Sequence, residues 1–278
     1  AAGGDGSRFG LQVPYIEQEA PLGLAHAVKI SQPFIGTDPF VMYLGDNLIK
    51  DGVTPFVREF QSEKPHAQIL LAHVERPWEF GVAELSGERV VRLEEKPKQP
   101  RSDLALVGVY LFTRSIFDAV RAIKPSARGE LEITDAIQWL ISNGRRVRTE
   151  LLTGWWIDTG KLTPLLEANR LLLEKVETRI DGSVDDASSV DGRVVIAEGA
   201  QIVNSTIRGP VAVGRDTRVI DSFIGPFSAI GNDCEIVHSE VEHAVVMDGS
   251  KVLHIPRLED SLIGREAVVE RSAKRPRA

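Results

Sequence analysis

Two aspartates that follow apolar, strand-like stretches have the residue type and placement for metal or phosphate chemistry. Asp46 follows the apolar run 40–44, and Asp158 follows the stretch Trp155–Ile157. In α/β proteins, ligands bind beyond the carboxyl ends of the strands. Mg²⁺ prefers oxygen donors and is often held by one or two carboxylates together with substrate phosphates. The pattern predicts a magnesium site, and the alternative is that each aspartate is a turn residue or a helix N-cap.

Three further segments place polar groups at the ends of expected elements. The loop Gln18–Ala27 enters a helix, whose first N–H groups suit an anion or a base edge. The segment Leu93–Pro97 carries charges to a strand end, and Gly129–Asp135 carries acids to a helix start, where the helix dipole favours them. Each segment alone also fits an ordinary strand or helix end. The six histidines show no metal-ligand spacing, and no Walker loop or Gly-x-Ser-x-Gly elbow is present.

The elements that must position these residues alternate between strand and helix in the first part of the chain. Such alternation predicts a layered α/β domain, with continuous apolar runs as strands buried in a parallel sheet. The expected strands are 13–16, 40–44, 67–74, 81–84, 89–94 and 104–112. The expected helices are 23–30, 54–61, 115–123, 133–142 and 162–176.

The second part of the chain repeats every 17 residues. Steps near six residues, closing every third step, predict a three-sided parallel β-helix of hexapeptide repeats, and the alternative is an irregular β-sandwich. The repeating apolar series are Ile196, Val213 and Ile230; Ile202, Val219 and Ile236; and Ile207, Ile224 and Val241. Asn204, Asp221 and His238 are expected at corners, and an extra loop is expected near 247–257. Turn residues with permissive dihedrals are expected at Gly209, Gly214, Gly225 and Gly231.

Composition sets the broad class. Fifteen of the 17 aromatic residues lie at or before Trp156, so the two parts build different cores, and we expect domains at 1–180 and 181–278. The net charge of −7 argues against nonspecific binding of nucleic acid or of an anionic membrane. The single cysteine, Cys234, fits a reducing compartment. No apolar run reaches the ~18 residues of a membrane span, so we expect a cytoplasmic protein.

Eight stretches occur together in an order that resembles the sugar-nucleotide pyrophosphorylases, and most closely the long-form glucose-1-phosphate thymidylyltransferases. The stretches are Gly4–Leu11, Gln18–Ala27, Leu44–Asn47, Phe80–Val82, Leu93–Pro97, Val107–Tyr110, Arg128–Asp135 and Gly154–Gly160. The resemblance implies a Rossmann-like α/β nucleotidyltransferase domain with a mixed sheet, followed by a left-handed parallel β-helix. It also implies nucleotidyl transfer from dTTP to α-D-glucose 1-phosphate, giving dTDP-glucose and pyrophosphate.

The resemblance implies roles for residues on the nucleotide side. Gln18 would read the pyrimidine edge with the help of the Gly23 backbone. Asp46 and Asp158 would hold Mg²⁺ against the phosphates, with Asp46 also counted as nucleotide-binding.

Six further residues are implied on the sugar-phosphate side. They are Gly81, Glu95, Tyr110, Trp156, Lys96 and Arg128. The first two would bind the hexose hydroxyls and the next two would shape the sugar pocket. Lys96 and Arg128 would hold the sugar phosphate and serve as the catalytic residues.

One departure from the family pattern leaves alternatives open. The family begins with a strand and a Gly-x-Gly-Thr-Arg loop, followed by a Pro-Lys segment, and none of these precedes Gly4–Leu11 here. We therefore expect a fragment of a longer protein, with poor stability and little turnover by itself. The alternatives are a UTP-dependent uridylyltransferase, a non-catalytic nucleotide-sugar-binding subunit, and acyl transfer near His243 and His254. Solenoid sides often mediate assembly, so a homo-oligomer is also expected.

Overall fold

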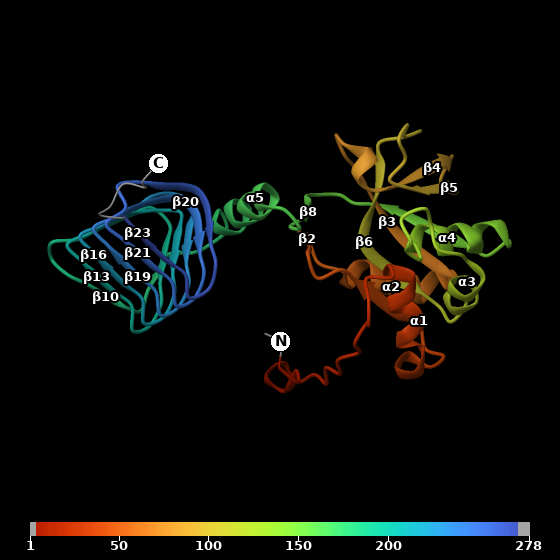
Figure 1. The fold of residues 1–278 in the computed structure, drawn as a ribbon, viewed down its shortest axis with the longest axis horizontal. Helices are drawn as coiled ribbons and strands as arrows, with labels where there is room; N and C mark the ends of the chain where they lie inside the picture. The colour runs from red at the N-terminus through yellow and green to blue at the C-terminus, as the bar shows by residue number, and fades with distance from the viewer. Residues whose placement is uncertain (1–3, 272–278) are drawn as a thin grey trace, which may run out of the picture. The chain divides into compact units, whose positions relative to one another are not determined.

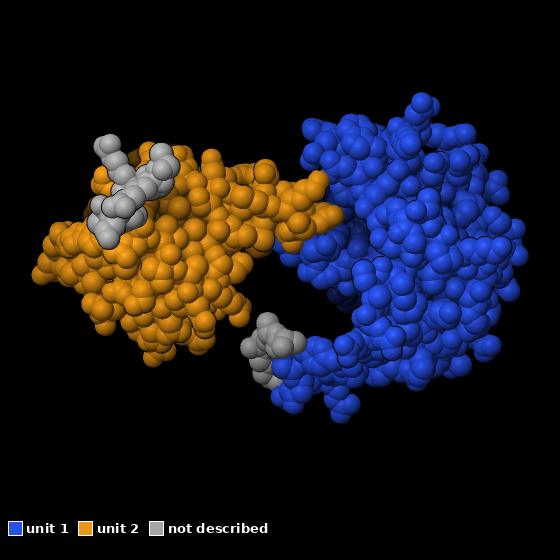
Figure 2. All heavy atoms as spheres, in the orientation of Figure 1, with its two compact units in different colours: residues 1–156 blue, residues 157–278 orange. Residues whose placement is uncertain are grey.

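The computed structural model describes residues 4–271 and divides the chain into two compact units. Unit 1 is Ala1–Trp156 and unit 2 is Ile157–Ala278, shown in separate colours in Figure 2. Within the described part of the chain, no helix has the length and apolar character needed to cross a membrane.

Unit 1 is built on a mixed sheet centred on two long apolar strands. β3 (Ala67–His73) and β6 (Leu104–Phe112) run antiparallel, and the strand order is β5-β4-β6-β3-β7, with β1 also paired to β6 (Figure 1). Among the described strands of this sheet, β3 and β7 are the one pair that runs in parallel. The remaining strands are β1 (Phe40–Tyr43), β4 (Gly81–Ser86), β5 (Arg89–Glu95) and β7 (Val147–Leu151).

Side-chain alternation along the central strands builds a core on each face of this sheet. Ile69 and Leu71 pack with α1 (Leu24–Ile35), α3 (Ile116–Ala122) and α4 (Ile133–Ser142), whereas Leu70 packs with Phe56 of α2 (Thr54–Glu63) on the other face. This pattern follows from the two-residue period of a strand. Two 3₁₀ turns, at Ser7–Phe9 and Pro77–Glu79, complete the described elements of the unit, together with β2 (Asn47–Ile49) and the start of β8 (Trp156–Asp158).

Most predicted elements of unit 1 are present, and three features differ. The strand at 104–112 and the helix at 133–142 have the predicted bounds. The predicted strand at 13–16 is wrong, because this segment pairs with no strand. The run 40–44 was expected to be buried in a parallel sheet, but β1 pairs antiparallel with β6 and leaves Val41 and Tyr43 about two-fifths exposed. β7 was not predicted, because its polar residues give no strand signal.

Unit 2 is a parallel β-solenoid with three faces, as the 17-residue repeat predicts (Figure 1). Ile202, Val219 and Ile236 stack in register on one face, each at most 1% exposed. The strands are β9 (Arg179–Ile180), β10 (Ser183–Val184), β11 (Ser189–Asp191), β12 (Val194–Ile196), β13 (Gln201–Val203), β14 (Thr206–Arg208), β15 (Val211–Val213), β16 (Arg218–Ile220), β17 (Phe223–Ile224), β18 (Ser228–Ile230), β19 (Glu235–Val237), β20 (Glu240–Val246), β21 (Lys251–Leu253), β22 (Leu258–Ile263) and β23 (Val268–Glu270).

Serine and polar corner residues hold one edge of the coil. The Ser222 N–H donates to Ser205 Oγ at 3.0 Å, and the Ser239 N–H donates to Ser222 Oγ at 3.1 Å. Asn204 and His238, expected at corners, have φ of 45°, the left-handed conformation that tight corners require. The repeated serines therefore satisfy backbone donors that the corners would otherwise leave buried and unpaired.

Two details of the predicted coil are wrong. No loop of several residues is inserted at 247–257. Instead one corner loses a residue and the next corner, between Leu253 and Leu258, gains one, because Val237 pairs with Leu253, 16 positions on, whereas Val241 pairs with Leu258, 17 positions on. Ile230 pairs with Val246, 16 positions on, while Val241 still pairs with Leu258, 17 positions on, so the strand β20 runs through the shortened corner. The predicted turn glycines do not have positive φ. They are needed for close approach, because a Cβ at Gly231 would lie 2.5 Å from Asp248 Oδ1 of the next coil.

Helix α5 (Leu162–Leu173) belongs to unit 2 by its contacts. Asn169 Nδ2 donates to the Phe227 carbonyl at 2.9 Å, which fixes the helix to the solenoid. The compact units therefore divide before this helix, whereas the sequence pattern places the domain boundary after it, near residue 180. That boundary stays a prediction.

Candidate active site

The β4–β5 hairpin brings Gly81 and Glu95 together. They are register partners, and Glu95 Oε2 accepts a hydrogen bond from Thr134 Oγ1 at 3.2 Å. A Cβ on Gly81 would lie 2.6 Å from Thr134 Cγ2 and 3.1 Å from Glu95 Oε2. Only glycine therefore allows the hairpin to approach the first turn of α4 this closely. The Lys96 N–H donates to the Phe80 carbonyl at 3.0 Å, so the base of the hairpin positions Lys96 as well.

Arg128 lies beside Glu95 and two other carboxylates. Its Nη1 is 3.5 Å from Glu95 Oε1 and 3.7 Å from Glu132 Oε1, and its Nη2 is 3.1 Å from Glu130 Oε1. The side chain is 42% exposed, so the guanidinium can also reach solvent and a phosphate in it. Guanidinium groups bind phosphate through paired hydrogen bonds, which suits this position to a sugar phosphate.

Burial and like charge perturb the acids of this cluster. Burial raises the pKa of Glu95, and the neighbouring Glu132 carboxylate raises it further, while Lys96, Thr134 and Arg128 partly oppose the shift. Burial also raises the pKa of Asp135, with Glu132 again adding to the effect. A largely buried acid with a raised pKa, Glu95, beside a positioned arginine marks a candidate functional site.

Asn47 organises the other end of the site. It is 4% exposed, and its Nδ2 donates to Asp46 Oδ1 at 2.8 Å. Its Oδ1 accepts from the Gly108 N–H at 3.1 Å and from Trp156 Nε1 at 2.6 Å. A Cβ on Gly108 would lie 2.7 Å from Asn47 Cγ, so glycine is required there. The exposed Asp46 carboxylate therefore has a fixed orientation just after β1.

An aromatic contact joins the two ends. The Phe80 and Trp156 rings meet edge to face, with centroids 5.5 Å apart. Trp156 hydrogen-bonds Asn47, and the Phe80 carbonyl receives the Lys96 N–H. The predicted residues Asp46, Trp156, Gly81, Glu95, Lys96 and Arg128 thus belong to one connected set of contacts in unit 1.

The predicted base-reading loop is fastened to the same region. Gln18 Nε2 donates to the Gly23 carbonyl at 3.2 Å and lies 3.0 Å from His26 Nδ1. The Leu131 N–H donates to the Leu22 carbonyl at 2.8 Å, and its own carbonyl accepts from the Ala25 N–H at 3.0 Å. These bonds attach the loop of Gln18 and Gly23 to the segment that carries Arg128, a residue predicted to hold the sugar phosphate.

The contacts named so far leave out two predicted residues. Tyr110 is 4% exposed in the core, with its ring stacked on Phe112, and burial raises its pKa, with the nearby Glu95 carboxylate raising it further. Asp158 belongs to unit 2, where its Oδ1 accepts from the Gly160 N–H at 3.0 Å. The assigned roles of both residues stay predictions.

The carboxylate oxygens of this site suit a hard cation such as Mg²⁺, which takes most of its other ligands from the substrate and from water. Among residues 4–271, no three His, Cys, Asp or Glu side chains cluster so as to hold a metal ion. Mg²⁺ does not need such a cage, because one or two carboxylates and substrate phosphates suffice. The oriented, exposed Asp46 carboxylate fits that requirement.

Sequence reasoning missed three residues of the site. Asn47, Thr134 and Glu132 were read as part of motifs but given no role. The signal was present for Asn47, because an amide next to the predicted metal ligand can both donate and accept hydrogen bonds. No local signal marks Thr134 or Glu132, whose function depends on the distant Glu95 and Arg128.

Comparisons with known proteins show the family to which the chain belongs. The nucleotidyl transferase family matches residues 2–175. Glucose-1-phosphate thymidylyltransferase of Streptomyces griseus is 53% identical over 279 residues, which is 100% of this chain and 79% of that protein. The enzyme of the same name from Streptomyces antibioticus is 52% identical over 99% of this chain and 78% of its own length.

A solved structure gives the same result for the fold. A Bacillus anthracis protein described as a glucose-1-phosphate thymidylyltransferase, in complex with a sucrose, is 40% identical with a TM-score of 0.57. The alignment covers 61% of this chain and 68% of that one.

Proposed function

The chain belongs to the nucleotidyl transferase family, and we propose that it transfers a thymidylyl group from dTTP to α-D-glucose 1-phosphate, giving dTDP-glucose and pyrophosphate. The observation that carries the proposal is the connected set of contacts from Asp46 through Trp156 and the β4–β5 hairpin to Arg128. The proposal assigns metal binding to one carboxylate of this set, that of Asp46, and phosphate binding to its two cationic side chains, those of Lys96 and Arg128.

The reaction needs charge neutralisation and positioning more than a protein nucleophile. A phosphate oxygen of the sugar phosphate attacks the α-phosphorus of the triphosphate. The new O–P bond forms as the bond to the bridging oxygen breaks, and pyrophosphate leaves in line. Two anions must approach each other, so cationic groups that hold both phosphates in line lower the barrier.

The chain's own residues supply the acceptor side of this arrangement. Arg128 and Lys96 hold the sugar phosphate, while the Glu95 carboxylate and the Gly81 backbone bind the hexose hydroxyls. Thr134 fixes the Glu95 rotamer by its hydrogen bond. Because Glu95 is largely buried, its hydrogen bonds to hydroxyls are stronger than in water.

The nucleotide side uses the base-reading loop and the aspartates. Gln18 binds the pyrimidine edge, and the Gly23 backbone lies beside it. Asp46 and Asp158 would hold Mg²⁺, which supplies charge neutralisation on the phosphates when bound. Asn47 keeps the Asp46 carboxylate in place for this purpose.

Pyrophosphate release with dTTP, glucose 1-phosphate and Mg²⁺ tests the proposal. Relative to the activity of the unaltered chain, we expect a loss of ~10²-fold or more in Asp46→Asn and in Arg128→Ala, because each removes a charge that contacts the reacting phosphates. Arg114→Ala, an exposed arginine with no ion pair among the described residues, is the matched control.

Two results would overturn the proposal. Tight binding of dTDP-glucose by calorimetry with no pyrophosphate release would identify a non-catalytic binding subunit. Faster release from UTP than from dTTP would identify a uridylyltransferase, a close alternative because one ring methyl is worth only ~1–3 kcal/mol.

The organisation of the whole protein forms part of the proposal. Residues 1–180 are the nucleotidyltransferase domain, and 181–278 are a left-handed β-helix whose sides join copies into a homo-oligomer. The protein acts in the reducing cytoplasm, in keeping with its one free, buried cysteine, Cys234. Light scattering coupled to size-exclusion chromatography measures the oligomer, and a monomeric mass would contradict it.

A further inference from the structure

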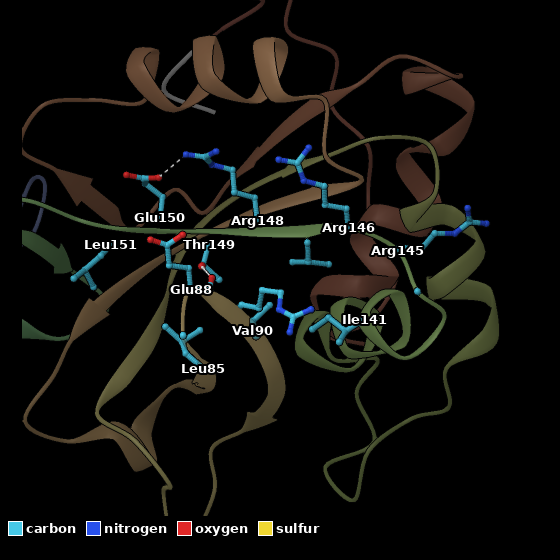
Figure 3. Close-up of a pocket in the computed structure, with 14 residues that line it drawn as sticks. Leu85, Glu88, Val90, Ile141, Arg145, Arg146, Arg148, Thr149, Glu150 and Leu151 are labelled. Atoms are coloured by element: carbon cyan, nitrogen blue, oxygen red, sulfur yellow. Dashed lines mark hydrogen bonds and ion pairs between the residues drawn. The ribbon is translucent and has the colours of Figure 1, made fainter.

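A groove runs along the outer edge of β7 in unit 1. Its volume is about 780 Å³, and it is lined by every residue from Gly144 to Leu151. The tip of the β4–β5 hairpin forms the facing wall (Figure 3). The hairpin is held there because Thr149 Oγ1 donates to the Glu88 carbonyl at 2.9 Å. Strand and hairpin tip thus form a groove that shares no lining residue with the candidate active site.

The backbone of β7 is unpaired on the groove side. The Ala67 N–H donates to the Arg146 carbonyl at 3.4 Å, and the Leu152 N–H donates to the Leu71 carbonyl at 2.9 Å. Because strand backbones alternate, the even-numbered residues of β7 bond to β3. The N–H and C=O groups of Val147, Thr149 and Leu151 point the other way, and no partner strand pairs with them among the described residues.

The edge of the sheet at β5 is protected, in contrast to β7 and to the free side of β1, neither of which has a partner strand among the described residues. On β5, the Leu93 N–H donates to Gln138 Oε1 at 2.7 Å, and α4 covers the strand. Native sheets usually cover or charge their edges to prevent unwanted pairing. The bare edge of β7 is therefore a site where a further strand can add.

The groove carries positive charge on a protein that is negative overall. Its lining has four arginines and two glutamates, against a net charge of −7 for the chain. Arg146 pairs with Glu63 at 2.6 Å, and Arg148 pairs with Glu59 and Glu150. The two remaining arginines, Arg89 and Arg145, have no carboxylate in ion-pair range within residues 4–271.

Apolar side chains complete the lining. Leu85 and Val90 from the hairpin, Ile141 from α4 and Leu151 from β7 all border the groove (Figure 3). An extended peptide presents alternate side chains to opposite sides. In such a peptide, the side chains on one side would contact the apolar lining, and the side chains on the other side would contact the arginines.

We propose that this groove binds an extended, acidic segment of a partner protein, which adds to β7 as a new strand. Five residues of β7 span ~17 Å at ~3.3 Å per residue, so the segment is about five or six residues long. Backbone pairing to Val147, Thr149 and Leu151 supplies affinity, as in other strand-addition complexes. Carboxylates reaching Arg89 and Arg145 supply the charge selectivity.

The unpaired arginines favour an acidic partner over a second copy of this chain. If two β7 strands paired antiparallel about Thr149, Arg145 would face Thr153 of the other copy. That pairing sets Arg148 opposite Glu150 of the other copy, but it leaves Arg145 without a carboxylate, whereas an acidic segment supplies one.

Fluorescence anisotropy with a labelled hexapeptide of alternating glutamate and valine tests the proposal on the full chain. We expect saturable binding that weakens with salt, with no comparable binding of the lysine–valine peptide. A glutamate–valine peptide methylated on alternate backbone nitrogens should bind at least ~10-fold more weakly, because it cannot pair with a strand edge. Amide hydrogen exchange at Thr149 should slow when the unmodified peptide binds.

Charge reversal locates the site. The double variant Arg89→Glu with Arg145→Glu should bind the peptide at least ~10-fold more weakly, while Arg114→Glu should bind it as the unaltered chain does. Equal binding by the double variant, or by the methylated peptide, would overturn the proposal. A dimer that protects the Thr149 amide without any peptide would also overturn it, in favour of self-pairing.

Discussion

Replacing Asn47 by alanine should remove the buried side chain that hydrogen-bonds Asp46, Gly108 and Trp156. We expect this loss to destabilise unit 1 and to impair the candidate site. The substitution leaves the Gly108 N–H, which is buried, and the Trp156 Nε1–H, which is half-buried, without their acceptor. It also removes the donor that orients Asp46.

The magnitude follows from these three bonds. A buried donor left unpaired costs ~1–3 kcal/mol, which applies in full to the Gly108 N–H. Trp156 can partly recover a bond to water, so ~1 kcal/mol is appropriate there. The free energy of unfolding should fall by about 2–4 kcal/mol. A residue that orients a metal ligand typically accounts for 10–100-fold in activity, so kcat/KM for pyrophosphate release should fall by ~10–100-fold.

Tryptophan fluorescence in urea measures the stability loss in the correct unit. All four tryptophans lie at or before Trp156, so their signal reports unit 1 and not the solenoid. Asn143→Ala is the matched control, because Asn143 Nδ2 donates to the Trp139 carbonyl at 2.8 Å at an exposed helix end. That variant should lose less than ~1 kcal/mol.

Asn47→Asp separates the two effects. Aspartate has the same shape and keeps both acceptor bonds, but it replaces the donor to Asp46 with a second carboxyl. We expect Asn47→Asp to retain more stability than Asn47→Ala, because both acceptor bonds remain, and we expect the activity loss to persist. If Asn47→Ala unfolds at the same urea concentration as Asn143→Ala, or if both Asn47 variants are equally unstable, the reasoning about these hydrogen bonds is refuted.

Three further perturbations test other parts of the structure. Gly81→Ala should raise the KM for glucose 1-phosphate and destabilise unit 1 by ~1–3 kcal/mol, because its Cβ would clash with Thr134; an unchanged KM would contradict the proposed sugar contact. The pKa of Glu95 is raised on folding, so its stabilising contribution is present below its ordinary value of 4.5 and is lost as pH rises through the raised pKa. Glu95→Gln should therefore gain stability relative to the unaltered chain as pH increases from 4.5, measured by urea unfolding, and parallel pH profiles would argue against this. Ser222→Ala should leave the Ser239 N–H unpaired and destabilise the solenoid by ~1–3 kcal/mol, seen by circular dichroism as an earlier unfolding of unit 2, with no shift in the tryptophan signal.

Local patterns predicted the elements well where the chain repeats or where an apolar stretch is long. The 17-residue series correctly placed Ile202, Val219 and Ile236 on one inward face. The strand at 104–112 and the helix at 133–142 were found with the structure's own bounds. These features depend on side-chain periodicity over short segments, which the sequence displays directly.

Local sequence patterns failed where the conformation of a segment depends on its packing against another segment that is distant in the sequence. The polar strand β7 forms because β3 pairs with it, and the shortened corner at 242–245 keeps its strand because the coils on both sides hold it in register. The solenoid glycines were read as turn residues, but they are required because the next coil lies against them. None of these causes is visible within a few residues of its effect.

For the candidate site as well, some features were determined by the sequence and others by the tertiary structure. By itself, the sequence determined the chemical groups, their order along the chain and the family resemblance, because these are properties of residue type and spacing. Only the tertiary structure decided that Asn47 joins Asp46 to Trp156 and Gly108, which are 109 and 61 positions away from Asn47. It also decided that Thr134 and Arg128 meet Glu95. The physical reason is that a buried polar group must find its partner wherever the fold brings one, and sequence separation places no limit on that distance.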